Sequence, residues 1–171
     1  MLSATCVVFL LIAALSGCDT STPTVEDVIV PYERRPVQQA DPDQWPPLAT
    51  EQEALQPTFE SVPKSVHPGD DLRYVIALHN NGGDDVSLHP CPAYYSSWGE
   101  SLPVAEANEF LNCPEAPSAV PGNGTVRFEM VIDLPDGLTG ESGTIIWQLK
   151  GANDAETEPA FSRMITMRAR P

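Results

Sequence analysis

Histidine, serine and carboxylate side chains are the groups of this chain that could act in hydrolysis, so their spacing is considered first. A serine hydrolase with a nucleophile elbow needs a Gly-x-Ser-x-Gly motif, and the sequence contains none. The three histidines stand apart: His67 precedes Pro-Gly, His79 ends an alternating segment, and His89 precedes Pro-Cys. These positions indicate no Ser–His–acid arrangement. We therefore expect neither catalysis nor a cofactor.

Metal binding is the second chemistry to consider, because copper proteins use histidine, cysteine and methionine side chains that meet at one rim of a domain. The available ligands are His89, Cys91, Met130, Met164 and Met167. Two of them, Met130 and Met167, fall on the core-facing phase of alternating segments, where methionine is ordinary core filling. Copper handling is therefore an alternative, and we predict no metal ligands.

Calcium has two candidate sites, the acidic pairs Asp70-Asp71 and Asp84-Asp85. Both stand on predicted turns, where carboxylates and loop carbonyls can surround a calcium ion. Neither pair belongs to a calcium-loop motif, so we expect solvated turn residues.

The first eighteen residues indicate export and lipidation. An apolar run over residues 6–15 is too short to cross a bilayer, which takes about 20 residues, and it is typical of a secretory signal. It ends in Leu15-Ser16-Gly17-Cys18, the lipobox pattern of bacterial lipoproteins, although the residues before the run include no Lys or Arg. We predict a signal peptide over residues 1–17, a lipid on Cys18, and a protein held at the extracytoplasmic face of the cell membrane.

The remaining cysteines follow by elimination. Cys6 leaves with the signal and Cys18 is acylated, so only Cys91 and Cys113 remain, and an exported domain oxidises such a pair. Their disulfide closes a loop over residues 92–112 and contributes roughly 3 kcal/mol to the free energy of unfolding. Residues 100–109 are polar and poor in β-branched side chains, so we expect a loosely held excursion that the bridge returns to the sheet.

An aromatic cluster inside this cystine loop is the best indication of ligand binding. Tyr94, Tyr95 and Trp98 stand within five residues, where aromatic faces can stack on a sugar or form the centre of a protein interface. The competing interpretation is that one or two of these rings pack beneath the loop as a small core.

Residues 18–56 have the composition of a tether. Residues 19–56 contain six prolines, eight acidic residues and two basic ones, with few large apolar side chains, and such a segment buries too little surface to fold alone. We predict an extended, proline-stiffened tether that lifts the domain by as much as ~100 Å from the membrane. Local exceptions are a short edge strand within residues 25–32 and a helical turn within residues 49–55.

From residue 57 onward the hydrophobic pattern has a period of two, which is typical of half-buried β-strands. Turn signals such as Asn80-Asn81-Gly82-Gly83 separate the alternating segments at intervals of about 8–12 residues. The expected strands lie within residues 58–66, 72–79, 86–88, 126–134, 145–149 and 161–169. We predict an all-β domain over residues 57–171, an immunoglobulin-like antiparallel β-sandwich of about seven strands with Trp147 in its middle and one disulfide.

Several of these segments, in this order, resemble a group of immunoglobulin-like domains in secreted and membrane-anchored actinobacterial proteins. The matching segments are Val86-Ser87-Leu88, Cys91-Pro92-Ala93-Tyr94, Leu111-Asn112-Cys113, Val120-Pro121-Gly122 and Phe128-Glu129-Met130. The resemblance implies a fold and an extracytoplasmic location, and it implies no reaction. More loosely, Leu78-His79-Asn80-Asn81 is similar to a segment of the BsuPI-type proteinase inhibitors, whose inhibitory loop has no counterpart in this sequence.

The net charge of −15 excludes one class of partner, because an acidic chain repels the phosphates of nucleic acids. Acidity otherwise favours solubility and basic partners. The sequence therefore predicts a cell-envelope lipoprotein whose immunoglobulin-like domain is a non-catalytic binding or structural module. The expected partners are the membrane, through the lipid, and an envelope protein or glycan. The alternatives are copper handling and carbohydrate binding through Tyr94, Tyr95 and Trp98.

Overall fold

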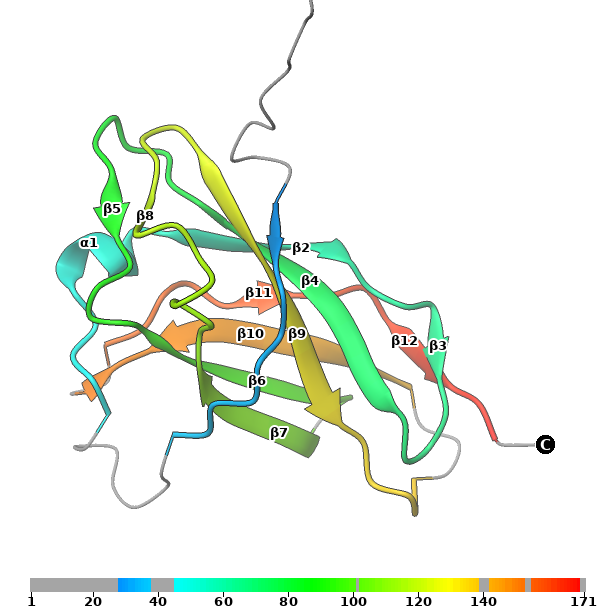
Figure 1. Ribbon diagram of the computed structural model, residues 1–171. Coiled ribbons are helices and arrows are strands. Elements are labelled where there is room, and N and C mark those ends of the chain that lie inside the picture. The colour runs from blue at the N-terminus through cyan, green and yellow to red at the C-terminus, as the bar shows by residue number, and fades with distance from the viewer. Residues whose placement is uncertain (1–27, 38–44, 101, 139–141, 153–154, 170–171) are drawn as a thin grey trace, which may run out of the picture.

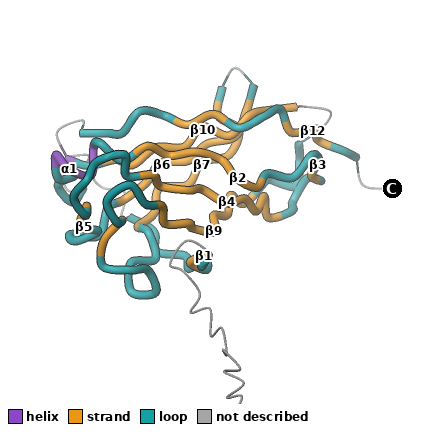
Figure 2. The backbone as a smooth tube through the Cα atoms, turned by 90° about the horizontal axis from the view of Figure 1, so that it is seen from above, coloured by secondary structure: helices purple, strands orange, loops and turns teal. Residues whose placement is uncertain are grey.

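The computed structural model describes residues 28–37, 45–100, 102–138, 142–152 and 155–169. Within these residues the chain forms two facing β-sheets (Figures 1 and 2). One layer contains β10 (Ser142–Lys150), β6 (Ala93–Gly99) and β7 (Pro103–Phe110), and the other contains β4 (Asp71–His79) and β9 (Thr125–Asp133). No helix in the described part of the chain is long and apolar enough to cross a membrane. The predicted all-β, immunoglobulin-like sandwich is confirmed, but two short pairings between strands are parallel and not antiparallel as expected.

The first sheet has the strand order β1-β9-β4-β2. Its strands are β1 (Ile29–Val30), β9 (Thr125–Asp133), β4 (Asp71–His79) and β2 (Gln56–Ser61). The two central strands pair antiparallel along their whole length, from Asp71 opposite Asp133 to His79 opposite Thr125. Both are the alternating segments of the sequence, and their inward residues are buried.

The second sheet has the order β3-β12-β10-β6-β7, with β11 also paired to β10. Its strands are β3 (Ser65–Val66), β12 (Ile165–Met167), β10 (Ser142–Lys150), β6 (Ala93–Gly99), β7 (Pro103–Phe110) and β11 (Ala160–Phe161). A small separate pair joins β5 (Val86–Ser87) to β8 (Ala119–Val120). The described residues thus hold more strands than the seven expected, because six of them are only two or three residues long.

The core lies between the two layers. Trp147 and Trp98 from the second sheet are fully buried and face Phe128, Ile76 and Met130 from the first. The predicted central position of Trp147 is confirmed. Burying aromatic side chains of this size supplies much of the hydrophobic stabilisation of a small sandwich.

The segment between the two cysteines differs from the expected loose excursion. Residues 93–99 and 103–110 form β6 and β7, the two strands of a hairpin, which pair from Ala93 opposite Phe110 to Gly99 opposite Pro103. β6 also pairs along its length with β10, so it is an interior strand of its sheet. The polar composition of residues 100–109 arises because β7 is an edge strand with one face toward solvent.

The boundary predicted at residue 57 also differs from the structure. Val30 is 1% exposed and packs in the core, and Leu48 and Leu55 join the same cluster. Between the last two lies the short helix α1 (Thr50–Glu53), whose buried Gln52 donates hydrogen bonds to the carbonyl oxygens of Ser87 and Pro90. The described parts of the expected tether are therefore part of the folded domain, and the two local exceptions are its strand and its helical turn.

Candidate functional site

The predicted disulfide is present, and it lies at the base of the β6–β7 hairpin. Cys91 precedes β6 and Cys113 follows β7, with their Cα atoms 5.9 Å apart. Leu111 donates a backbone hydrogen bond of 3.1 Å to Pro92 beside the bridge. Both sulfurs belong to a structural crosslink, so neither cysteine offers a thiol for catalysis or metal binding.

Two of the three aromatic residues proposed to bind a ligand are core residues. Tyr94 is 1% exposed and its ring stacks on Trp147 with centroids 5.6 Å apart, while Trp98 is completely buried. Both rings lie on the face of β6 that packs against the first sheet, which is why they are inaccessible to a ligand. For Tyr94 and Trp98 the structure shows the competing interpretation, that one or two of the rings are core residues, although they pack in the main core and not beneath a loop.

Tyr95 has the opposite orientation on β6. Successive side chains of a strand point to opposite faces, so Tyr95 lies on the outer face of the second sheet, where it is partly exposed. Its hydroxyl donates a hydrogen bond of 2.7 Å to Oε1 of Glu106 on the adjacent β7. The structure leaves Tyr95 as the one accessible member of the predicted trio.

A buried carboxylate lies on β7, within the segment that was expected to be a loose excursion. Glu109 is 7% exposed, and its two carboxylate oxygens accept hydrogen bonds of 3.1 Å from the hydroxyls of Tyr32 and Tyr94. Burial, and then the charge of Glu109, raise the pKa of Tyr32 to about 12. Burial is also the main cause that raises the pKa of Tyr94. The alternation of Ala105, Ala107 and Glu109 was a sequence signal for the burial of Glu109, but it did not indicate the tyrosine partners.

Residues 28–37, which we call the docking segment, close the side of the sandwich where β9 and β7 approach each other. β1 pairs in parallel with β9, and further along the backbone of Val37 donates to Asn108 and that of Phe110 to Arg35. An ion pair joins Arg34 to Asp133, and Asn112 donates a hydrogen bond of 3.0 Å to the carbonyl of Pro31. Figure 1 shows this blue segment crossing over β9 toward β7.

Three of the five possible copper ligands considered above have structural roles in the fold. Cys91 is disulfide-bonded, and Met130 and Met167 are buried in the core. His89 and Met164 are exposed, after β5 and after β11 respectively. In the described part of the chain, no three or more His, Cys, Asp and Glu side chains form a group that could hold a metal ion.

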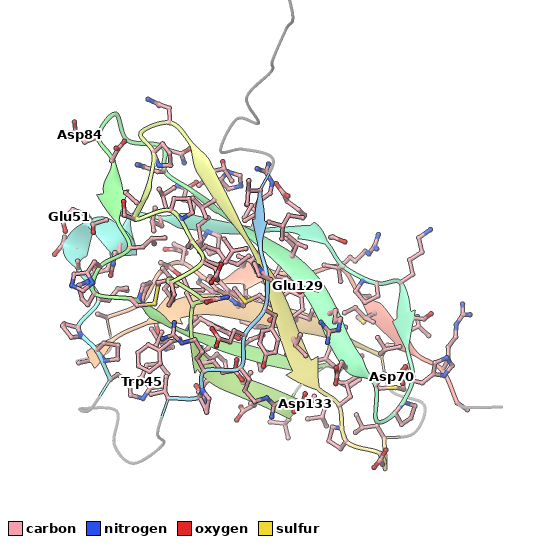
Figure 3. The ribbon with its side chains drawn as sticks, viewed as in Figure 1. Trp45, Glu51, Asp70, Asp84, Glu129 and Asp133 are labelled. Atoms are coloured by element: carbon pink, nitrogen blue, oxygen red, sulfur yellow. A yellow bond between two sulfur atoms is a disulfide. The ribbon has the colours of Figure 1, made fainter. Side chains whose placement is uncertain are left out.

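The two acidic pairs lie at opposite ends of the molecule, as the labels of Asp70 and Asp84 in Figure 3 show. Asp70 accepts a hydrogen bond of 3.1 Å from the backbone of His67, and Asp85 accepts one of 2.9 Å from the backbone of Gly122. Asp71 pairs with Arg73. These carboxylates support turns and surface ion pairs.

Two surface grooves remain as candidate binding sites. One, of about 510 Å³, lies beside the docking segment, and its carboxylates are those of Glu106, Glu109 and Asp133, each with a partner in the chain. The other, of about 540 Å³, lies between β2 and β11 and includes Glu60, Phe161 and Arg163 in its wall. The second groove is the better candidate, because Phe161 is 64% exposed there.

The sequence matches no protein-family model, and no curated protein matches it significantly. Among solved structures, the chain is similar to the CARDB domain of a Pyrococcus furiosus protein in complex with di-metal ions (10% identity, 68% of this chain and 94% of that chain, TM-score 0.40). It is also similar to AvmM, which catalyses macrocyclization in alchivemycin A biosynthesis (10% identity, 70% of this chain and 91% of that chain, TM-score 0.43). A third similar structure is that of a Niemann-Pick type C2 protein from the Japanese carpenter ant (11% identity, 66% of this chain and 92% of that chain, TM-score 0.39). Likeness at this level carries no argument about function.

Proposed function

We propose that this protein is a lipid-anchored cell-envelope protein whose sandwich is a non-catalytic binding or structural module. Its anchor is the acylated Cys18, and its domain extends from the docking segment to the C-terminal strands. The proposal combines the lipobox with the fold.

The observation that carries the proposal is how soon after Cys18 the chain enters the fold. Val30 is already packed in the core. Residues 19–29 are the only chain between the lipidated cysteine and Val30, and they reach at most about 40 Å, at roughly 3.3–3.6 Å per residue. The anchored domain is therefore held near the bilayer, well within the ~100 Å that a tether ending at residue 56 would allow.

The non-catalytic part of the proposal is supported by the histidine contacts. Both ring nitrogens of His79 lie within hydrogen-bond distance of threonine hydroxyls, 2.7 Å from Thr58 and 2.9 Å from Thr125. Nδ1 of His67 lies 2.9 Å from the carbonyl oxygen of Arg168. These rings brace strands and turns against each other.

Replacing the predicted lipid acceptor tests the proposal. Cys18→Ala should release the protein from the membrane fraction or leave an uncleaved precursor, because the thioether can form only on that thiol. Membrane fractionation with mass measurement of the chain reports both outcomes. Cys6→Ala is the matched control, since Cys6 leaves with the signal peptide, and it should behave like the unaltered protein.

An acylated, detergent-extractable product from the Cys18→Ala chain would contradict the anchor. Full release of the Cys6→Ala chain would likewise show that the fractionation reports signal-peptide damage rather than loss of the lipid.

A further inference from the structure

Basic side chains are scarce in this acidic chain, and their pairing is uneven. Among the described residues, four of the eight Lys and Arg side chains form ion pairs with carboxylates, namely Arg34, Arg73, Arg127 and Lys150. Of the other four, Arg35 lies in the docking segment. The remaining three, Lys64, Arg163 and Arg168, are all exposed and lie along the pairing of β3 and β12.

Exposed apolar side chains gather at the same place. Five large apolar side chains are exposed in the described part of the chain, and two of them are Phe161, at 64%, and Met164, at 51%. Phe161 ends β11 and Met164 lies in the connection to β12, so both are close to Arg163 in the chain. Figure 1 shows β12 beside β3. We call Lys64, Phe161, Arg163, Met164 and Arg168 the basic edge.

The basic edge is continuous with the groove between β2 and β11. Phe161 and Arg163 belong to both, and the guanidinium of Arg163 donates to the carbonyl of Val62 in the groove wall. That bond holds the arginine at the end of the groove. The one carboxylate in the wall, that of Glu60, forms an ion pair of 2.7 Å with Arg127, so its charge is compensated.

We propose that the basic edge and its groove bind an extended acidic segment of a partner polypeptide. An apolar side chain of the segment packs on Phe161, and a neighbouring carboxylate pairs with Arg163. This inference rests on the proposed role as a binding module and names the surface and the partner. Its basis is charge complementarity at a concave site that also offers an exposed aromatic ring.

The groove favours recognition by side chains over addition of a strand to the sheet. β2 is an edge strand, but Pro57 has no backbone N–H and the register shifts between Phe59 and Ser61. Prolines and bulges are the devices that prevent regular pairing at a sheet edge. The partner segment therefore lies in the groove without extending the first sheet.

A membrane surface is the less favoured occupant. A bilayer is flat and does not fill a concave groove of about 540 Å³. The net charge of −15 also opposes approach to an extended anionic bilayer. At an ionic strength of about 0.15 M, where the Debye length is about 8 Å, a short acidic segment interacts mainly with the nearby charges of the basic edge.

The test uses the whole mature chain carrying Cys18→Ser, which keeps every described residue and needs no detergent. The probe is a fluorescent peptide of sequence Thr-Val-Glu-Phe-Asp-Glu-Val-Thr, and binding is followed by anisotropy. We expect saturable binding at an ionic strength of about 0.15 M that weakens as ionic strength rises to about 1 M, because the Debye length falls from about 8 Å to about 3 Å and the ion pairs at the basic edge are screened. Peptides with amides in place of the carboxylates, or with serine in place of phenylalanine, should bind more weakly.

Variants locate the site. Arg163→Gln should weaken binding by about 2–5-fold, as for loss of a surface ion pair, and Phe161→Ser by more than about 5-fold, as for loss of an aromatic anchor. The matched controls are Arg35→Gln, a basic residue outside the basic edge, and Leu102→Ser, whose side chain is 78% exposed elsewhere. Both controls should bind like the unaltered chain.

Three results would overturn the proposal: no saturable binding of the acidic peptide, equal binding of the amide peptide, or equal losses in the control variants. In a fourth result, the chain binds vesicles of equal parts phosphatidylglycerol and phosphatidylcholine but does not bind the peptide, and Arg163→Gln abolishes the vesicle binding. That result would assign the basic edge to lipid. Because the measurement uses a chain without lipid, its failure is distinct from failure of the Cys18 experiment.

Discussion

At the scale of single residues, the tyrosine hydroxyls are bonded inside the chain. Tyr32 and Tyr94 donate to Glu109, Tyr95 donates to Glu106, and the hydroxyl of Tyr74 lies 2.6 Å from Oγ of Ser96 in the core. These are all four tyrosines of the sequence. Burial is the largest cause that raises each of their pKa values.

This arrangement predicts a tyrosine titration that depends on folding. Tyrosine ionises near pH 10 in an unfolded chain, whereas the pKa of Tyr32 is raised to about 12 in the folded protein. The folded state therefore keeps protons that the unfolded state loses, and the free energy of unfolding should fall as pH rises from about 10 to about 12. Ultraviolet titration of tyrosinate, on the native chain and in denaturant, measures the difference.

Tyr32→Phe is the matched variant, because it keeps the ring and removes the titrating hydroxyl. Without the Tyr32 hydroxyl, the free energy of unfolding should fall less between about pH 10 and 12 than it does in the unaltered chain. Native tyrosines that titrate together with those of the denatured chain would contradict the described hydroxyl contacts.

At the scale of elements, the cystine hairpin combines two kinds of constraint. The β6–β7 ladder and the β6–β10 ladder hold residues 93–99 by backbone hydrogen bonds, and Tyr94 and Trp98 are anchored in the core. The disulfide joins only the ends of the hairpin. Its main contribution is therefore to limit the freedom of the unfolded chain.

Reduction of the bridge, or Cys113→Ser, should lower the free energy of unfolding by about 2–5 kcal/mol and leave the hairpin folded. The expected result is a lower melting temperature with an unchanged near-ultraviolet spectrum below the transition, because Trp98 and Trp147 keep their packing. Thermal melts with and without reductant measure this. An unchanged melt, or loss of the tryptophan signal at low temperature on reduction, would contradict it.

The elements differ in how far the sequence predicts them. β4 and β9 alternate between apolar and polar residues because each has one face toward solvent, and both were predicted. β6 was not predicted, because it buries the polar residues Ser96 and Ser97 and therefore shows no alternation between apolar and polar residues. β1 is two residues long and is held by long-range pairing with β9, so no local period identifies it as more than a short edge strand. The Tyr32–Glu109–Tyr94 contacts depend on that pairing and were beyond prediction for the same reason.

At the scale of the whole molecule, the core includes Val30, which is only twelve residues after the proposed anchor at Cys18. The docking segment covers the edges of β9 and β7, and exposed strand edges of this kind promote association between chains. The segment therefore connects the proposed lipid anchor to the fold and protects one side of the sandwich.

The last prediction concerns where this unit can be cut. A chain beginning at Val28 keeps every described residue and is the reference for two shorter chains. A chain beginning at Pro57 loses Val30, Leu48 and Leu55 from the core. Each buried aliphatic side chain contributes about 1.5–3 kcal/mol, so the sum is comparable to the roughly 5–15 kcal/mol that stabilises a typical domain. We expect this shorter chain to be largely unfolded or aggregated in circular dichroism and sedimentation.

A chain beginning at Trp45 separates the two losses, since it keeps α1 and loses only the docking segment, and it should fold with reduced stability. Equal melting temperatures for all three chains would show that the domain begins at residue 57 and that the docking segment is dispensable.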